Sequence, residues 1–312
     1  MENNINKSHG YVPKEKILIP PIYSFPPKLI LSINWIFNFF FPWWMLYVGF
    51  AFLSWFYLTP SMEVMVNYNY DWVFLIWLRN VFFITIFAGG IHWWLYIRKS
   101  QSTDYKYYSK WPNQKSKKFL FNDQVKDNIF WSVISGCTIW TFYETIVLWS
   151  YANDFVNTTS WSENLLYLVF FSIFMPFLGG IHFYLIHRFL HIPMIYRIAH
   201  QTHHNNINTG PWSGISMHPI EHFLYFSIFL VWLVIPVDPF VITLTGIWFG
   251  VGPVQSHAGF KKIVLLKNKS IEFSDYYHHL HHKHFDANYG NIYTPIDNIF
   301  KTFHNGKVSP KK

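Results

Sequence analysis

The sequence predicts an all-α integral membrane protein with four transmembrane helices, a re-entrant helical hairpin and a cytosolic helical cap. Three observations lead to this fold class. Hydrophobic residues make up 51% of the 312 residues and charged residues only 13%, roughly half the charged share of an average soluble domain. The apolar residues are gathered in long runs, and the basic residues lie between those runs.

Four apolar runs are long enough to cross a bilayer, which takes about 20 residues of helix. These runs are Trp35 to Leu58, Trp72 to Ile97, Ile129 to Tyr151 and Leu165 to about His187. We expect each of them to form a transmembrane helix.

Two shorter apolar runs follow, from Phe223 to Ile235 and from Phe240 to Val251, with Pro236 and Pro239 between them. Each run is too short to cross a bilayer comfortably. The pair therefore predicts a re-entrant or shallow helical hairpin.

Lysine and arginine give the orientation. They are frequent in residues 1–28 and 98–128 and absent from 59–71 and 152–164. Because basic loops stay in the cytosol, we expect both termini, the 98–128 loop and everything after the fourth span to be cytosolic. This topology suits a multi-pass protein of a bacterial inner membrane or the endoplasmic reticulum. The net charge of +8 then meets anionic lipid headgroups and does not indicate nucleic-acid binding.

Two charged residues interrupt the spans: Arg79 in the second and Glu144 in the third. Each lies about two turns from the outer end of its helix, roughly 10–12 Å below the membrane boundary. Charged groups in the bilayer pair with one another or line a cavity. We therefore expect a structural ion pair between Arg79 and Glu144, with a role in substrate access as the alternative.

The sequence contains 17 histidines, and many of them are clustered in three boxes. At spacings of three and four residues, side chains share one face of a helix. Imidazoles without a nearby thiolate suit iron, and the single cysteine, Cys137, excludes cysteine-based clusters. Eight box histidines exceed the four ligands that one zinc takes, so two metal ions are expected. The first box contains His187 and His191, the second His200, His203 and His204, and the third His278, His281 and His282.

Together with their surroundings, the boxes resemble the fatty acid hydroxylase superfamily, which includes sterol desaturases, methylsterol oxidases and sphingolipid hydroxylases. Met217-His218-Pro219-Ile220-Glu221 is similar to the His-Pro-x-Glu segment of that family, and His257-Ala258-Gly259-Phe260 to its His-(Ser/Ala)-Gly-aromatic segment. Phe285 and Asn288-Tyr289-Gly290 resemble the tail that follows the last box. The family's Trp-Asp pair is replaced here by Ile296-Asp297.

The resemblance implies that the cap carries a di-iron histidine cluster, with the eight box histidines as ligands and His257 as a further ligand. His218, Glu221 and His222 either bind metal or hydrogen-bond to ligands. We expect no catalytic residue beyond the metal ligands. His279 and His284 are expected to face solvent. The predicted divisions are a cytosolic tail (1–28), an N-terminal membrane region (29–164), the di-iron domain (165–303) and a C-terminal tail (304–312).

The expected function is O₂-dependent hydroxylation of a lipid C–H bond. The lipid is a fatty acyl chain, a sphingolipid, a sterol or an amino-acid lipid. The resemblance implies two Fe²⁺ ions and electrons from NAD(P)H, delivered by cytochrome b5 or a ferredoxin with its reductase. One alternative is a desaturase with the same site. Another is a non-enzymatic metal-binding membrane protein or transporter, which would place histidines or acids along a path inside the spans.

Overall fold

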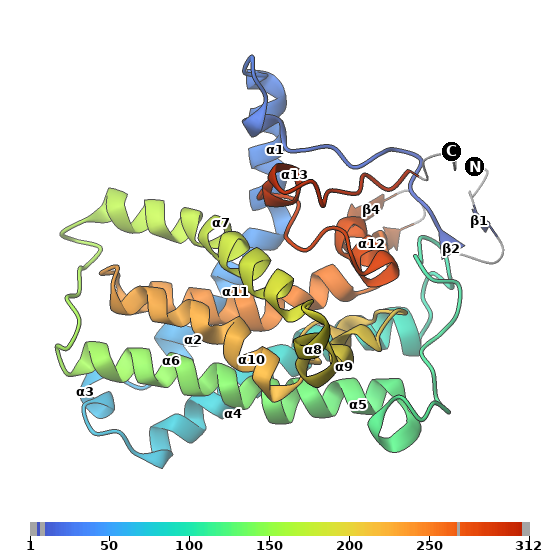
Figure 1. The fold of residues 1–312 in the computed structure, drawn as a ribbon. Coiled ribbons are helices and arrows are strands. Elements are labelled where there is room, and N and C mark those ends of the chain that lie inside the picture. The colour runs from blue at the N-terminus through green and yellow to red at the C-terminus, as the bar shows by residue number, and fades with distance from the viewer. Residues whose placement is uncertain (1–4, 7–9, 267–268, 308–312) are drawn as a thin grey trace.

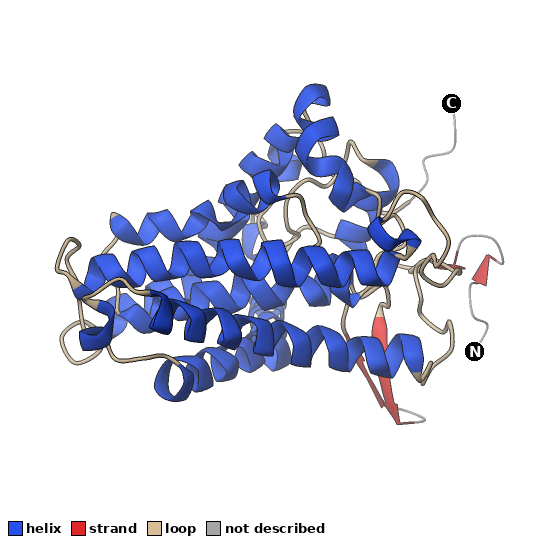
Figure 2. Ribbon diagram, turned by 90° about the horizontal axis from the view of Figure 1, so that it is seen from below, coloured by secondary structure: helices blue, strands red, loops and turns tan. Residues whose placement is uncertain are grey.

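The computed structural model describes residues 5–6, 10–266 and 269–307, and the described chain is mostly helical (Figures 1 and 2). Long helices pack side by side into a bundle. At one end of this bundle lie several short helices and the strands (Figure 1). This end of the molecule contains the histidine boxes.

Among the described residues, three stretches of helix are long and apolar enough to cross a membrane: Leu29–Leu58, Tyr70–Ile97 and Leu165–Leu190. They correspond to the first, second and fourth predicted spans. The third predicted span does form an unbroken helical stretch, made of α5 (Gln124–Phe130), η5 (Trp131–Gly136) and α6 (Cys137–Ala152). Its serines, threonines and Glu144 lower its mean hydropathy, so it is not among the three apolar stretches.

The bundle is built from α2, α4, α6, α7 and α11. Short elements connect these helices or lie at the box-containing end. In chain order, the elements other than α5, η5 and α6 are β1 (Ile5–Asn6), β2 (Gly10–Tyr11), η1 (Pro21–Tyr23), α1 (Leu29–Phe39), η2 (Phe40–Trp44), α2 (Met45–Leu58), α3 (Met62–Met65), α4 (Tyr70–His92), η3 (Trp93–Ile97), η4 (Leu120–Asn122), α7 (Leu165–Leu190), α8 (Pro193–Ile195), η6 (Tyr196–His200), α9 (Gln201–His204), η7 (Pro211–Ser213), α10 (Pro219–Phe226), η8 (Ser227–Leu233), α11 (Pro239–His257), β3 (Lys262–Leu266), β4 (Lys269–Glu272), α12 (Tyr276–His284) and α13 (Ile296–Ile299).

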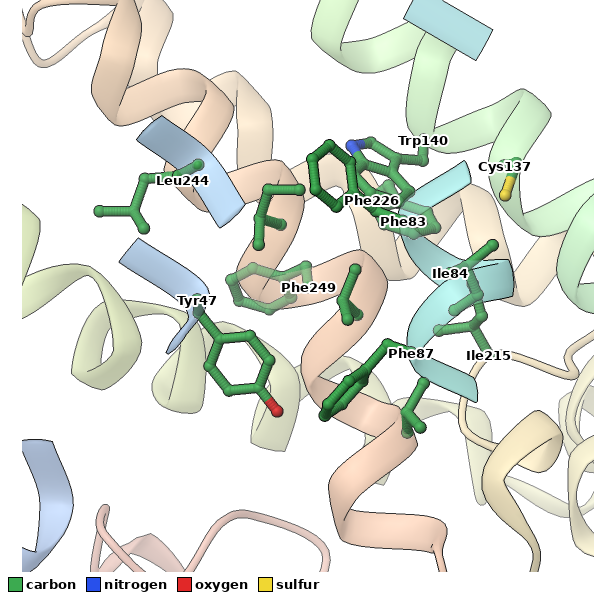
Figure 3. Packing of buried hydrophobic residues seen from close by; sticks show 14 of the residues in the cluster. Tyr47, Phe83, Ile84, Phe87, Cys137, Trp140, Ile215, Phe226, Leu244 and Phe249 are labelled. Carbon is green, nitrogen blue, oxygen red and sulfur yellow. The ribbon is translucent and has the colours of Figure 1, made fainter. Parts of the chain in front are cut away.

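Helix α11 lies at the centre of the bundle, in contact with α2, α4, α6 and α7. Close packing against α6 depends on glycine, since a Cβ atom on Gly250 would lie 2.2 Å from the Trp140 ring. Around this crossing, Trp140, Phe226 and Phe249 belong to one apolar core (Figure 3). The close approach fixes α11 in position, and with it the histidine at the end of the helix.

The length of α11 differs from the prediction of a short, shallow segment. Its apolar run ends at Val251, but the helix continues through Pro253 to His257. With 19 residues at 1.5 Å per residue, α11 is about 28 Å long, and most of its residues from Val241 to Val254 are buried. The re-entrant character of the predicted hairpin stays a prediction.

Arg79 and Glu144 lie inside the bundle and join α4 to α6. Nη2 of Arg79 donates to Oε2 of Glu144 at 2.5 Å, and both side chains are buried. The guanidinium also donates to the side chains of Thr59 and Asn80. Such extra hydrogen bonds offset the cost of burying charge, and they favour a structural role over substrate access.

Candidate metal centre

Four structural units bring nine histidines together at one end of the bundle. The last turn of α7 and its C-cap residue provide the first box. Segment η6–α9 provides the second box, the final residue of α11 provides His257, and α12 provides the third box. All nine rings are buried except that of His191, which is partly exposed. Histidines as far apart in the chain as His187 and His282 thus meet in one small volume.

The nine histidines form two groups, and in each group the ligating atoms lie within 4.8 Å of one another. A metal ion about 2.0–2.1 Å from each nitrogen fits such spacing. The first group is His187, His191, His200, His204 and His281. The second group is His203, His257, His278 and His282. These are the nine histidines expected as ligands from the sequence, now divided between two sites.

The second and third boxes each contribute to both groups. His204 from the second box and His281 from the third belong to the first group, where their Nε2 atoms are 3.0 Å apart. His203 and His282 belong to the second group. Helices α9 and α12 therefore lie between the two sites and hold them next to each other.

Hydrogen bonds fix the orientation of several rings. Nδ1 of His203 donates to the carbonyl of Ser216, and Nδ1 of His257 to that of Pro253. Because a carbonyl oxygen only accepts, the Nε2 atoms of these two rings carry lone pairs. Those two Nε2 atoms face each other at 3.3 Å. Two lone pairs at this distance repel unless a cation lies against both, so this pair suits a metal ion.

The first group is oriented in the same way. Nδ1 of His187 donates to the carbonyl of Tyr289 at 2.6 Å, and Nδ1 of His281 to that of Ala287 at 2.7 Å. The Nε2 atom of His187 lies 3.0 Å from Nε2 of His200. Outer hydrogen bonds of this kind are typical of metal-binding histidines, where they fix the tautomer and raise ligand basicity.

Of the three residues left open between ligand and supporting roles, Glu221 contacts one of the nine clustered histidines. Its Oε1 atom lies 2.8 Å from Nδ1 of His200, and its Oε2 atom is buried without a partner. Burial raises the pKa of Glu221 well above its usual value. His222 is buried against Ser135 and the carbonyl of Ile215, and the half-buried His218 caps α10. Neither histidine joins the two groups.

One expectation about the third box is wrong. His279 is buried and does not face solvent. Its ring stacks on Tyr107 at a centroid distance of 4.9 Å and lies 5.8 Å from Tyr276. The reason is that the 98–123 connection folds back over the outer face of α12, which the sequence alone left uncovered. His284 is exposed, as expected.

Asp297 is a supporting residue that motif reading missed. Its carboxylate accepts four hydrogen bonds, from the backbone of Tyr289 and Gly290 and from the hydroxyls of Tyr277 and Thr302. These bonds hold the segment whose carbonyls orient His187 and His281. The sequence did contain a signal for this role. In the stretch that resembles the family's Trp-Asp pair, the tryptophan is replaced by Ile296 but the acid is present as Asp297.

A cavity of about 330 Å³ adjoins both histidine groups. It is lined by clustered histidines such as His203, His257 and His278, together with Glu221. Ten aromatic side chains also line it, and these are Phe39, Trp43, Trp44, Tyr47, Phe183, Tyr225, Trp248, Phe249, Phe273 and Tyr293. A mostly apolar cavity with a few polar groups is typical of a site for an apolar ligand.

Burial keeps the box histidines uncharged. It lowers the pKa of His203 to about 4 and holds the pKa values of His200, His204, His278, His281 and His282 well below the usual 6.5. Neutral imidazole is the form that binds metal. At pH 7 no proton needs to leave these rings before a metal ion binds.

These pKa values predict that acid destabilises the metal-free protein. Below pH 6.5 the unfolded chain binds protons that the folded chain does not, so the free energy of unfolding falls with pH. For His203 the loss runs from about pH 6.5 to about pH 4, at up to ~1.4 kcal/mol per pH unit. Thermal unfolding of metal-stripped protein in detergent should show a lower Tm at pH 5 than at pH 7.5. An equal Tm at both values would contradict the neutral, buried state.

Comparison with known proteins agrees with this geometry. Residues 168–302 match the sequence model of the family described as fatty acid hydroxylase. This part of the chain is similar to the fatty acid hydroxylase family. The matched residues contain every histidine of both groups. No solved structure matches the chain.

Curated relatives of this part of the chain include several sterol enzymes. A Delta(7)-sterol 5(6)-desaturase of Aspergillus fumigatus is 26% identical over 154 residues, which cover 43% of this chain and 48% of the relative. The Delta(7)-sterol 5(6)-desaturase of Saccharomyces cerevisiae is 29% identical over 117 residues, covering 37% and 31%. Human lathosterol oxidase is 28% identical over 130 residues, covering 41% and 43%. In each case the match spans less than half of the relative.

Proposed function

We propose that this protein is a membrane-bound, O₂-dependent di-iron oxygenase that hydroxylates a C–H bond of a lipid. The observation that carries the proposal is the pair of adjacent histidine groups, with Nε2 atoms facing inward, beside an apolar cavity. Ferrous iron bound by imidazoles supplies the activation of O₂ that an unactivated C–H bond requires. The fatty acid hydroxylase domain supports this chemistry.

We assign one iron to each histidine group. His187, His191, His200, His204 and His281 would hold the first iron, and His203, His257, His278 and His282 the second. Glu221 would keep the ring of His200 in place through its hydrogen bond to Nδ1. Rings held by such outer bonds give a site its geometry before the metal arrives.

The cavity residues would orient the substrate and exclude water. Phe183, Tyr225 and Phe249 form an apolar wall next to His203, His257 and His278. An alkyl chain or a flat ring system along this wall would present one carbon to the second group. Excluding bulk water protects a reactive site from side reactions. The protein's contribution is therefore positioning, while the metals supply the oxidising power.

Desaturation is the alternative outcome at the same site. The named relatives include sterol desaturases, which supports loss of two hydrogens from a sterol as the second candidate reaction. The two reactions need the same metals and the same apolar cavity. Their products differ by mass.

The topology proposed with this function places the cap in the cytosol and the bundle in the membrane. The basic residues of 98–128 support that orientation through the positive-inside rule. We further propose four spans, the domain limits 29–164 and 165–303, and tails at 1–28 and 304–312. Electrons would come from a separate donor, such as cytochrome b5 or a ferredoxin with its reductase.

A metal transporter is less well supported. It would need ligands along a path through the bundle. In the described residues, the two groups lie together at one end. Within the spans, His92 stacks on Tyr96 and His182 bonds to Ser227, and neither belongs to a group.

Iron analysis and product mass test the proposal. Protein purified without chelators should contain close to two iron atoms per chain by mass spectrometry of the metal. With O₂, an electron donor and total membrane lipid, one lipid should gain 16 mass units by hydroxylation or lose 2 by desaturation. Lipids of a deletion strain, compared with those of its parent, identify the substrate. Absence of iron, or the same products without O₂, would refute the proposal.

A further inference from the structure

Helix α1 is apolar and has no buried residue. Leu29, Ile30 and Phe37 are 70%, 75% and 60% exposed. No acidic or basic residue occurs from 29 to 62, and Lys28 precedes the helix. An apolar surface of this extent requires a partner. Continuity with the apolar stretch Leu29–Leu58 points to the bilayer itself.

The direction of α1 differs from that of the bundle. Figure 1 shows α1 standing away from the long helices, across their common direction. The change occurs at Phe41, whose backbone leaves the helical conformation (φ −117°, ψ 134°), and next to Pro42, which has no N–H to donate. If the bundle crosses the bilayer, α1 lies parallel to the membrane plane.

The last turn of α1 reaches the mouth of the cavity. The ring of Phe39 lies 5.5 Å from Phe177 of α7, 5.6 Å from Tyr293 and 6.4 Å from Trp248 of α11, measured between centroids. Phe177 and Tyr293 are 5.8 Å apart. All four rings are partly exposed. Phe39, Trp248 and Tyr293 line the cavity, so this aromatic cluster closes it on the side of α1.

Tyr293 is held in this cluster from two sides. Its carbonyl accepts a hydrogen bond from the hydroxyl of Tyr23 at 2.8 Å. On α7, a Cβ atom at Gly180 would lie 2.7 Å from Thr294 and 3.3 Å from the Tyr293 ring. The segment thus lies directly on α7 because Gly180 has no side chain. Phe39, by contrast, lies on α1, which has no buried residue. It is therefore the least constrained residue of the aromatic cluster.

We propose that α1 lies parallel to the membrane plane, so that the first of the four proposed spans is Phe40–Leu58, and that Phe39, Phe177 and Tyr293 form a lateral gate. Through this gate the apolar part of a bilayer lipid passes from the membrane into the cavity. The proposal builds on the proposed lipid substrate. It adds that the entrance opens sideways into the bilayer, with α1 as its movable edge.

Spin labels test the orientation of α1 without any need for iron. Cysteines would replace Ile30, Ile33 and Phe37 singly, in a Cys137→Ala background that removes the only native cysteine. In phosphatidylcholine vesicles, quenching by O₂ and by a nickel chelate gives the depth of each label. All three should lie at the same depth. A spanning helix would separate positions 30 and 37 by about 10 Å, and that result would overturn the proposal.

Labels on α4 provide the matched control. Leu75, Leu78 and Phe82 are 52%, 43% and 49% exposed, and their depths should change steadily along the helix. Coupling between labels on α1 of two chains would show that a second copy covers this surface. That outcome would also overturn the proposal.

Crosslinking tests the gate. Phosphatidylcholine with a diazirine on one acyl chain should label the peptides that contain Phe39 and Tyr293, in protein with or without iron. Phe39→Ala should increase labelling of the cavity wall at Phe249, whereas Phe74→Ala, at an exposed ring of α4, should leave it unchanged. Absence of labelling at Phe39 and Tyr293 would refute the gate. Failure of lipid oxidation alone, with these labels in place, would refute only the proposed function.

Discussion

Replacement of His281 by alanine is expected to abolish lipid oxidation and to reduce bound iron from about two atoms per chain to one or none. His281 is fully buried, and its Nε2 atom faces that of His204 at 3.0 Å. Its removal takes one of five nitrogens from the first group. His203→Ala should have the same effect through the second group. Iron content and O₂-dependent product, both per chain, are the measurements.

His284→Ala is the matched control for these substitutions. This histidine lies on the same helix, α12, but is exposed and belongs to neither group. Its replacement should leave iron and turnover unchanged. Normal turnover in His281→Ala or His203→Ala would show that the ligand assignment is wrong.

Asp297→Ala is expected to lower the free energy of unfolding by about 3 kcal/mol or more, since hydrogen bonds to a charged group contribute roughly 1.5–3 kcal/mol each. The buried carboxylate accepts four such bonds at 2.6–2.9 Å. Without them, the segment that presents the carbonyls of Ala287 and Tyr289 loses its attachment to α12. Iron binding should weaken as a consequence. Unfolding in detergent and iron titration measure the two effects.

Asp286→Ala serves as the control here, because Asp286 is exposed and lies in the same segment. It should keep native stability and iron content. If Asp297→Ala kept both as well, Asp297 would not support the ligands.

The sequence was sufficient to identify the histidines that cluster but not their division between two groups. Spacing of three and four residues predicted that box histidines share a helix face, and the structure places all nine within the two groups. The spacing within a box does not indicate which histidines of the other boxes join each ring in a group. His203 and His204 are adjacent in the chain yet belong to different groups, because α9 lies between the two sites.

Long-range packing accounts for the features that sequence patterns missed. An apolar run cannot show that Gly250 lets α11 approach Trp140, or that the helix continues to His257. Nor does the position of His279 on α12 reveal that Tyr107, from a distant connection, covers it. The break at Phe41 likewise separates two helices in a stretch that reads as one span.

The shared use of α9 and α12 has a consequence for assembly. An ion at the first site would further restrict the motion of both of these helices, and the second site would then depend on the placement of His257 at the end of α11. Less conformational entropy would remain to be lost when the second ion binds. Metal loading should therefore be cooperative, with few chains carrying a single ion.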